Sequence, residues 1–179
     1  MFVRPTATLS LAAIIPILLA SALSAQTETS ESSQPSDRLY FTSISPTEML
    51  RILDAERGSI ELDETGGDTT LEGRVTGKDY SVYFYECDGG EFGAPATPTS
   101  SCLGFEYRSY FTGYPDDSET INEWNANHHY GAMWRDEDGD LGLQLNTIVE
   151  GGITEDNIRM TFVWWQTVLE SFDNFMEGR

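Results

Sequence analysis

Three groups of side chains in this sequence could carry chemistry: the adjacent histidines His128 and His129, the acidic run Asp136–Asp140, and the cysteines Cys87 and Cys102. Neighbouring residues of a helix point about 100° apart. The two histidines therefore cannot easily share one metal ion, since a ligand pair on a helix needs i, i+4 spacing. A cation near a helix C-terminus interacts favourably with the helix dipole, so a structural role is sufficient for them. We expect no metal site at this pair.

The acidic run Asp136–Asp140 has the composition of a calcium loop but not its spacing. An EF-hand loop needs oxygen ligands at positions 1, 3 and 5, glycine at position 6 and glutamate at position 12. Aligning Gly139 with the glycine position places Trp134 at the first position and Leu145 at the last. An Asp-Gly pair is instead typical of a hairpin turn, so we expect a turn without a bound metal.

Recognisable motifs of catalysis or cofactor binding are missing from the sequence. It contains neither G-x-S-x-G nor the phosphate-binding patterns G-x-x-x-x-G-K-[ST] and G-x-G-x-x-G. With 30 aspartates and glutamates, pairs of carboxylates arise by chance, so their abundance does not indicate a glycosidase. We therefore expect no enzyme, no catalytic residues and no cofactor.

Residues 1–25 predict a secretory signal peptide. A short basic start precedes an apolar run, Leu9–Leu19, which is too short to span a bilayer and is followed by small residues. Cleavage after Ala22 or after Ala25 fits the small-residue rule. The other interpretation of this segment is a retained membrane anchor. After cleavage we expect no membrane insertion, and the predicted location is the periplasm of a Gram-negative bacterium or its surroundings.

Export would place the two cysteines in an oxidising compartment. Cys87 and Cys102 allow only one pairing, so we expect a disulfide. Closing a loop of about 15 residues stabilises the folded state by about 3 kcal/mol in the chain-entropy model. A metal site of two thiolates is the rival interpretation, but the pair lacks C-x-x-C spacing and a nearby histidine.

The composition indicates one acidic, folded domain. The chain has 179 residues and a net charge of −20, which repels the phosphates of nucleic acid and excludes it as an expected partner. Residues 26–38 contain no aliphatic or aromatic side chain and are predicted to form a disordered tether. The hydrophobic fraction of 39% is high enough for one folded domain, which we assign to residues 39–179.

The folded part is predicted to be an α+β domain, an antiparallel sheet with helices packed on it. Residues 45–48 have the sequence of a capping box and predict a helix that ends at Gly58. Alternating apolar residues separated by turn residues then predict four strands. A second helix follows Asp116–Glu119, a hairpin turns at Asp136–Asp140, and the last helix covers Thr154–Met176. The predicted element order is α-β-β-β-β-α-β-β-α.

The last helix carries more apolar residues than one sheet needs. One stripe consists of Ile158, Phe162, Trp165, Leu169, Phe172 and Met176. A second stripe beside it consists of Trp164, Val168 and Phe175. Together they cover about 160° of the helix, whereas a helix that covers one sheet needs roughly 100°. The second stripe either packs on another helix of the same domain or forms a surface for a protein partner or a second copy of the chain.

These segments, in their order and spacing, resemble the YbjN family of bacterial proteins in an exported form. The resemblance spans about Phe41 to Met176 and rests on Tyr83–Cys87 with Cys102, Ile121–Asn125, Tyr130-Gly131, Asp136–Asp140, Gly151–Ile153, and Trp164-Trp165 with Val168-Leu169 and Phe172. It implies a fold similar to that of type III secretion chaperones, which are small, acidic and often dimeric proteins that hold other polypeptides. Some cytoplasmic members are described as regulators of sensory transduction, and the signal peptide and cysteine pair set this chain apart from them.

The leading expectation is therefore an exported, non-enzymatic domain that binds or chaperones another polypeptide. The alternative is a small-molecule-binding protein or an enzyme with a site between the sheet and the C-terminal helix.

Overall fold

The computed structural model describes residues 40–54, 59–88, 94–114 and 117–177. The predicted signal peptide (1–25) and tether (26–38), as well as the helix stop predicted at Gly58, lie outside these residues. The elements in chain order are β1 (Tyr40–Phe41), α1 (Pro46–Asp54), β2 (Ser59–Asp63), β3 (Thr70–Val75), β4 (Lys78–Cys87), β5 (Cys102–Phe111), α2 (Ser118–Asn127), β6 (Ala132–Arg135), β7 (Leu141–Ile148), β8 (Ile153–Thr154) and α3 (Glu155–Glu177).

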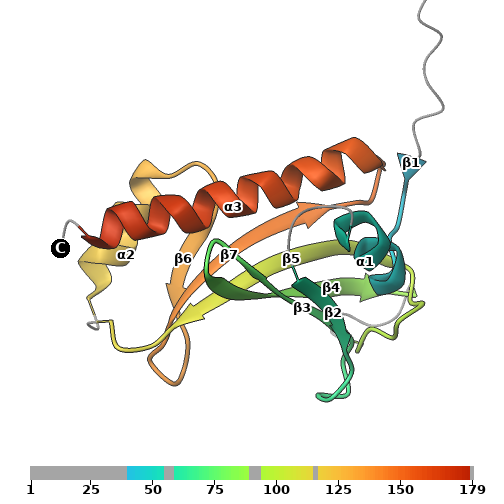
Figure 1. Ribbon diagram of the computed structural model, residues 1–179, viewed down its shortest axis with the longest axis horizontal. Coiled ribbons are helices and arrows are strands. Elements are labelled where there is room, and N and C mark those ends of the chain that lie inside the picture. Colours follow the sequence, from blue (N-terminus) through green and yellow to red (C-terminus); the bar gives the residue numbers. More distant parts are fainter. Residues whose placement is uncertain (1–39, 55–58, 89–93, 115–116, 178–179) are drawn as a thin grey trace, which may run out of the picture. The chain divides into compact units, whose positions relative to one another are not determined.

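The main sheet has six strands in the order β2-β3-β4-β5-β7-β6, and all neighbours are antiparallel. Figure 1 shows α3 lying across one face of this sheet, with α1 near its first turns and α2 beside its last turns. No helix of the described chain covers the other face, which we call the open face. The predicted α+β class is confirmed.

The first helix begins as its sequence predicts. The Oγ atom of Ser45 accepts a hydrogen bond from the N–H of Glu48 at 3.2 Å, and the Glu48 carboxylate accepts one from the N–H of Ser45 at 3.1 Å. This reciprocal pair is a capping box and satisfies two N–H groups that the helix itself leaves without a partner.

The core lies between α3 and the sheet. In β4 and β5 the inward residues alternate with outward ones, so Phe105 and Tyr107 are fully buried. The first apolar stripe of α3 meets them: the rings of Tyr107 and Trp165 stack at 5.8 Å. Burial raises the pKa of Tyr107, whose hydroxyl lies 3.2 Å from the Oγ1 atom of Thr161. The space beneath the helix is filled by aromatic side chains.

Two short strands were not predicted. Tyr40 and Phe41 of β1 pair with Thr154 and Ile153 of β8 in a separate two-stranded sheet. Each strand has only two residues, which is too short for an alternating pattern to be recognised in the sequence. The remaining elements follow the predicted order.

A disulfide joins Cys87 of β4 to Cys102 of β5, which are directly opposite each other in the sheet. Both cysteines are buried. The main chain of Cys102 also exchanges hydrogen bonds with Ile44, at 2.9 and 3.0 Å. The bridge therefore fixes the point where the segment before α1 attaches to the sheet, in addition to closing the loop between the two strands.

Reduction of this disulfide should destabilise the protein. We expect the free energy of unfolding to fall by about 3 kcal/mol, because the reduced unfolded chain regains the freedom that a closed loop of about 15 residues removes. Chemical denaturation with and without reductant measures the difference, and a C87A/C102A double variant should not respond to reductant. Two reactive thiols in the native, unreduced protein would contradict the prediction.

A carboxylate ties α1 to α3. Glu155 accepts hydrogen bonds from Arg51 at 2.9 Å and from Arg159 at 2.8 Å, and Arg159 also donates to the carbonyl of Ile52 at 2.7 Å. The hydrogen bonds from Arg51 and Arg159 hold the pKa of Glu155 below its ordinary value of 4.5. The charged form of Glu155 is thus the form that the folded state favours.

This lowered pKa predicts an acid-dependent loss of stability. The contribution of Glu155 is fully present above pH 4.5 and is lost as the pH falls through the lower folded-state value, because the unfolded chain then binds a proton first. A Glu155→Gln variant should be less stable than the parent near pH 7, and the difference should shrink in acid. Thermal melts across this range measure it, and a difference that is constant with pH would contradict the assignment.

Candidate functional site

The second apolar stripe of α3 is divided between the interior and the surface. Val168 is 3% exposed and packs against Gly131. Phe175 is half-buried, with its ring 5.4 Å from that of Trp124 in α2. Packing against other parts of the same domain therefore accounts for Val168 and Phe175. Trp164 is 39% exposed, and the partner-surface interpretation remains a prediction for this residue.

Trp164 belongs to an exposed cluster that the sequence did not reveal. Its ring stacks on that of Tyr130, with centroids 4.4 Å apart, and Tyr130 is 52% exposed. Met160 lies three residues before Val163 and four before Trp164, spacings that bring helix side chains together, and both Met160 and Val163 are also exposed. We call these four residues the aromatic patch. Tyr130 comes from the loop between α2 and β6, where no periodic pattern marks it, so only the folded chain shows that it meets α3.

The loop that carries Tyr130 is held away from the sheet. The carbonyl of Gly131 accepts a hydrogen bond from the indole N–H of Trp124 at 2.8 Å. Gly131 has a φ of 76°, and a Cβ at this position would lie 2.7 Å from Val168, so both the left-handed backbone and the close packing require glycine. The chain therefore joins β7 only from Ala132 onward, opposite Gln144.

The outer edge of β6 is closed by a side chain. The amide of Asn125 in α2 donates to the carbonyl of Met133 at 2.9 Å and accepts from its N–H at 2.8 Å. Because these groups of Met133 point outward, the neighbouring residues Ala132 and Trp134 direct theirs toward β7. The Asn125 amide thus occupies the place of a further strand at this edge.

β6 pairs with β7 only as far as Ala132 opposite Gln144. Beyond Gln144, the outer edge of β7 is not paired with a strand of the described chain. The N–H of Val149 donates to the carbonyl of Leu103, next to β5, at 2.7 Å. Every second residue before Val149 in β7 therefore also directs its N–H and C=O groups toward β5. The residues between them, Asn146 and Ile148, direct their N–H and C=O groups to the opposite side. Within the described ranges, no strand pairs with them there. We call Asn146–Ile148 the free edge.

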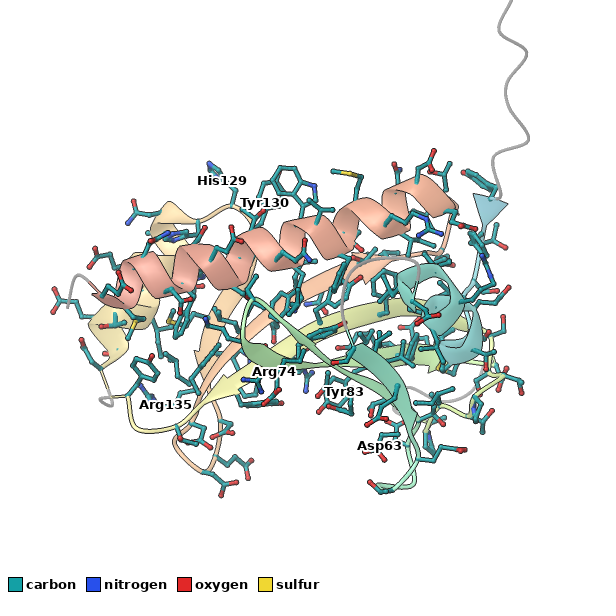
Figure 2. All side chains as sticks on the ribbon, in the orientation of Figure 1. Asp63, Arg74, Tyr83, His129, Tyr130 and Arg135 are labelled. Atoms are coloured by element: carbon teal, nitrogen blue, oxygen red, sulfur yellow. A yellow bond between two sulfur atoms is a disulfide. The ribbon has the colours of Figure 1, made fainter. Side chains whose placement is uncertain are left out.

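Two cavities flank the free edge, and both are lined in part by Asn146 and Thr147. The helix-side cavity has a volume of about 380 Å³ and is also lined by Tyr130 and Trp164. The open-face cavity has a volume of about 510 Å³ and is lined by apolar and charged groups, among them Tyr85, Leu103, Gly104, Ile148, Glu86 and Glu150. Figure 2 shows His129 and Tyr130 beside α3, and Arg74 and Tyr83 on the opposite side of the sheet.

An ion pair between the buried Glu106 and the partly buried Arg108 lies on the open face of the sheet. Glu106 is 4% exposed and is hydrogen-bonded to the Nε of Arg108, whose guanidinium lies over the rings of Tyr83 (4.7 Å) and Trp134 (5.8 Å). Burial acts to lower the pKa of Arg108, but the hydrogen bonds to Glu106 and Tyr110, together with the charge interactions with Glu106 and Tyr85, outweigh it and raise the pKa. Burial also raises the pKa of Tyr85. Both groups therefore keep their protons near neutral pH.

Among the other candidates for chemistry, His128, Asp136 and Asp140 make contacts within the fold, whereas His129 is exposed and lines the helix-side cavity. The ring of His128 stacks on Trp124 at 3.7 Å, and its Nδ1 lies 3.0 Å from the carbonyl of Trp124. Asp136 and Asp140 close the predicted hairpin turn through hydrogen bonds of 2.8 and 3.0 Å. Among the described residues, no three His, Cys, Asp or Glu side chains come together in a way that could hold a metal ion.

Removal of the Asn125 amide should expose the outer edge of β6. For Asn125→Ala we expect a loss of about 1–3 kcal/mol of stability, because the N–H and C=O of Met133 lose their partners. Chemical denaturation measures the loss. The matched control is Asn127→Ala, whose side chain donates to the main-chain carbonyl of Glu123 within α2 at 2.9 Å; an equal loss of stability in the two variants would refute this role.

Comparison of the chain with known proteins identifies one family. A family model named YbjN, with the description "Putative bacterial sensory transduction regulator", matches residues 45–178, which is well over half of the chain. No curated protein and no solved structure matches the chain. In the part of the chain that the structure describes, none of the helices has the length and apolar character needed to cross a membrane.

Proposed function

Because this chain belongs to the YbjN family, we propose that its domain is a non-enzymatic module that binds a segment of another polypeptide in an extracytoplasmic compartment. The observation that carries the proposal is the exposed stack of Tyr130 on Trp164. The neighbouring Trp165 is fully buried in the core, whereas Trp164 is 39% exposed. An indole that remains at the surface, already held by a second ring, is available for contact with a partner.

The physical properties of the aromatic patch suit a protein interface. Tyr and Trp bring a large contact area to an interface and lose little conformational entropy when their rings are already held. Met160 and Val163 extend the same exposed face along α3. The net charge of −20 keeps such a patch soluble and attracts a basic partner rather than an acidic one.

The location outside the cytoplasm is supported by the cysteine pair. Disulfides persist in oxidising compartments and are rare in the cytosol, and the bridge between Cys87 and Cys102 is part of the sheet. The predicted signal peptide at residues 1–25 agrees with this location.

A small-molecule site between the sheet and the C-terminal helix is the second candidate. The centre of that interface is filled by Tyr107, Phe162, Trp165 and Phe172, each at most 2% exposed. The helix-side cavity lies at the margin, where its lining includes Trp164 and the edge of β7. A site at the margin, open to the surface, fits a polypeptide segment better than an enclosed small molecule.

The substitution Trp164→Glu tests the proposal. We expect it to abolish the cross-links that the native protein forms to a partner in the intact cell envelope, because a charge and a lost ring both oppose an aromatic interface. The melting temperature should change little, because the side chain is partly exposed. Asn157→Glu, which adds the same charge at an exposed position of α3, is the control and should keep the cross-links.

Two results would overturn the proposal. One is an unchanged set of cross-linked proteins with the Trp164→Glu variant. The other is a native protein that forms no cross-links to any polypeptide. Light scattering of the purified protein separates a second copy of this chain from a different partner.

A further inference from the structure

We propose that the bound polypeptide adds as an extra β-strand along the free edge of β7, Asn146–Ile148, and that this segment alternates apolar side chains with lysine or arginine. The inference rests on the polypeptide-binding function proposed above, and it specifies the mode of binding and the chemistry of the partner.

The main chain of the free edge supplies the hydrogen-bonding template. Asn146 and Ile148 direct their N–H and C=O groups away from β5, and β6 starts only opposite Gln144. An added strand would pair with Asn146 and Ile148 in the same way as Ala132 pairs with Gln144. It would thus continue β6 along β7, beyond the point at which Gly131 leaves the sheet.

The two cavities provide places for the side chains of such a strand. Side chains of a strand alternate between the two faces of its sheet. The helix-side and open-face cavities lie on either side of the free edge and share Asn146 and Thr147 as lining residues. Successive residues of an added strand would enter the two cavities in turn, so the main chain gives affinity and the cavities give specificity.

The lining of each cavity selects a type of side chain. The helix-side cavity presents the rings of Tyr130 and Trp164, which favour an apolar or aromatic residue. The open-face cavity presents Ile148, which is 77% exposed, together with the carboxylates of Glu86 and Glu150. A lysine or arginine fits there, because its stem packs on the isoleucine while its charge reaches the carboxylates.

Charge also favours a basic segment of another polypeptide over a second copy of this chain at the free edge. Arg108, the basic residue in the lining of the open-face cavity, is already paired with Glu106. The charge that remains at this cavity is negative, and two copies of a chain with net charge −20 repel each other. A basic, extended segment of another polypeptide is therefore the occupant that this surface favours.

A peptide of defined sequence tests the inference. The probe is an N-acetylated, C-amidated peptide of about ten residues that alternates lysine and leucine, which is sufficient for one strand. Two control peptides are a version that alternates glutamate and leucine and a lysine version N-methylated at alternate amides. We expect the first probe to bind at physiological salt, to shift the amide NMR signals of Asn146 and Ile148, and to lose binding on N-methylation.

A matched pair of variants isolates the main-chain contribution. Ile148→Thr and Ile148→Pro both remove the exposed isoleucine, but only proline also removes the N–H that faces the free edge. Proline is tolerated where the N–H of a strand faces no partner strand. We expect Ile148→Pro to bind the lysine-leucine peptide about tenfold more weakly than Ile148→Thr.

The outcomes separate this inference from the proposed function. Equal binding by the two Ile148 variants, or binding by the N-methylated peptide, overturns strand addition even if Trp164→Glu still abolishes binding. Amide shifts confined to β2 overturn it as well. A dimer of the purified protein that Ile148→Pro dissociates assigns the free edge to a second copy and overturns the partner chemistry. If neither the probe nor any envelope protein binds the native chain, the proposed function fails together with the inference.

Discussion

The core of this domain is built around the contact between α3 and one face of the sheet. α3 has 23 residues and is therefore about 35 Å long, and its inward stripe stacks on the aromatic residues of β5. Once Trp165 is buried there, the residue before it, Trp164, must point about 100° away. Trp164 thus lies at the margin of the sheet because its neighbour occupies the centre, and the surface patch follows from the packing of the core.

The free edge has an equally specific cause. β6 pairs with β7 only from Ala132 onward because Trp124 binds the carbonyl of Gly131 and Val168 packs against that glycine. The same contacts bring Tyr130 to Trp164. The aromatic patch and the free edge therefore arise from one displacement of the loop before β6, in which the chain leaves the sheet to pack on α2 and α3.

The parts that could be predicted from sequence depend on contacts between near neighbours or on a pattern. The capping box at Ser45 needs only four residues, the alternation in β4 and β5 follows from burial of one face, and the cysteine pair allows one bridge. The resemblance to the YbjN family, drawn from the order of several segments, is confirmed by the match over residues 45–178. What could not be predicted depends on distant pairings: β1 with β8, Asn125 with Met133, and Tyr130 with Trp164. The helical period places Trp164, Val168 and Phe175 on one side of α3. It carries no information about the loop and the second helix that pack on Val168 and Phe175.

At this end of the sheet the outer edge of β6 is bonded to a side chain, whereas the free edge of β7 is not paired with a strand of the described chain. An open strand edge is a hazard for a protein, because it can pair with other chains. At β6 the hazard is removed by a side chain, Asn125, which bonds both main-chain groups of Met133. At Asn146–Ile148 no strand of the described chain closes the edge, although α3 and the loop at Tyr130 lie close enough to line a cavity there. The shortness of this stretch and the acidity of the surface limit pairing between identical copies, because a short edge is a poor template and like charges repel. Charge repulsion does not act against a chain of opposite charge, so the acidity that opposes association of the protein with itself is compatible with capture of a basic strand.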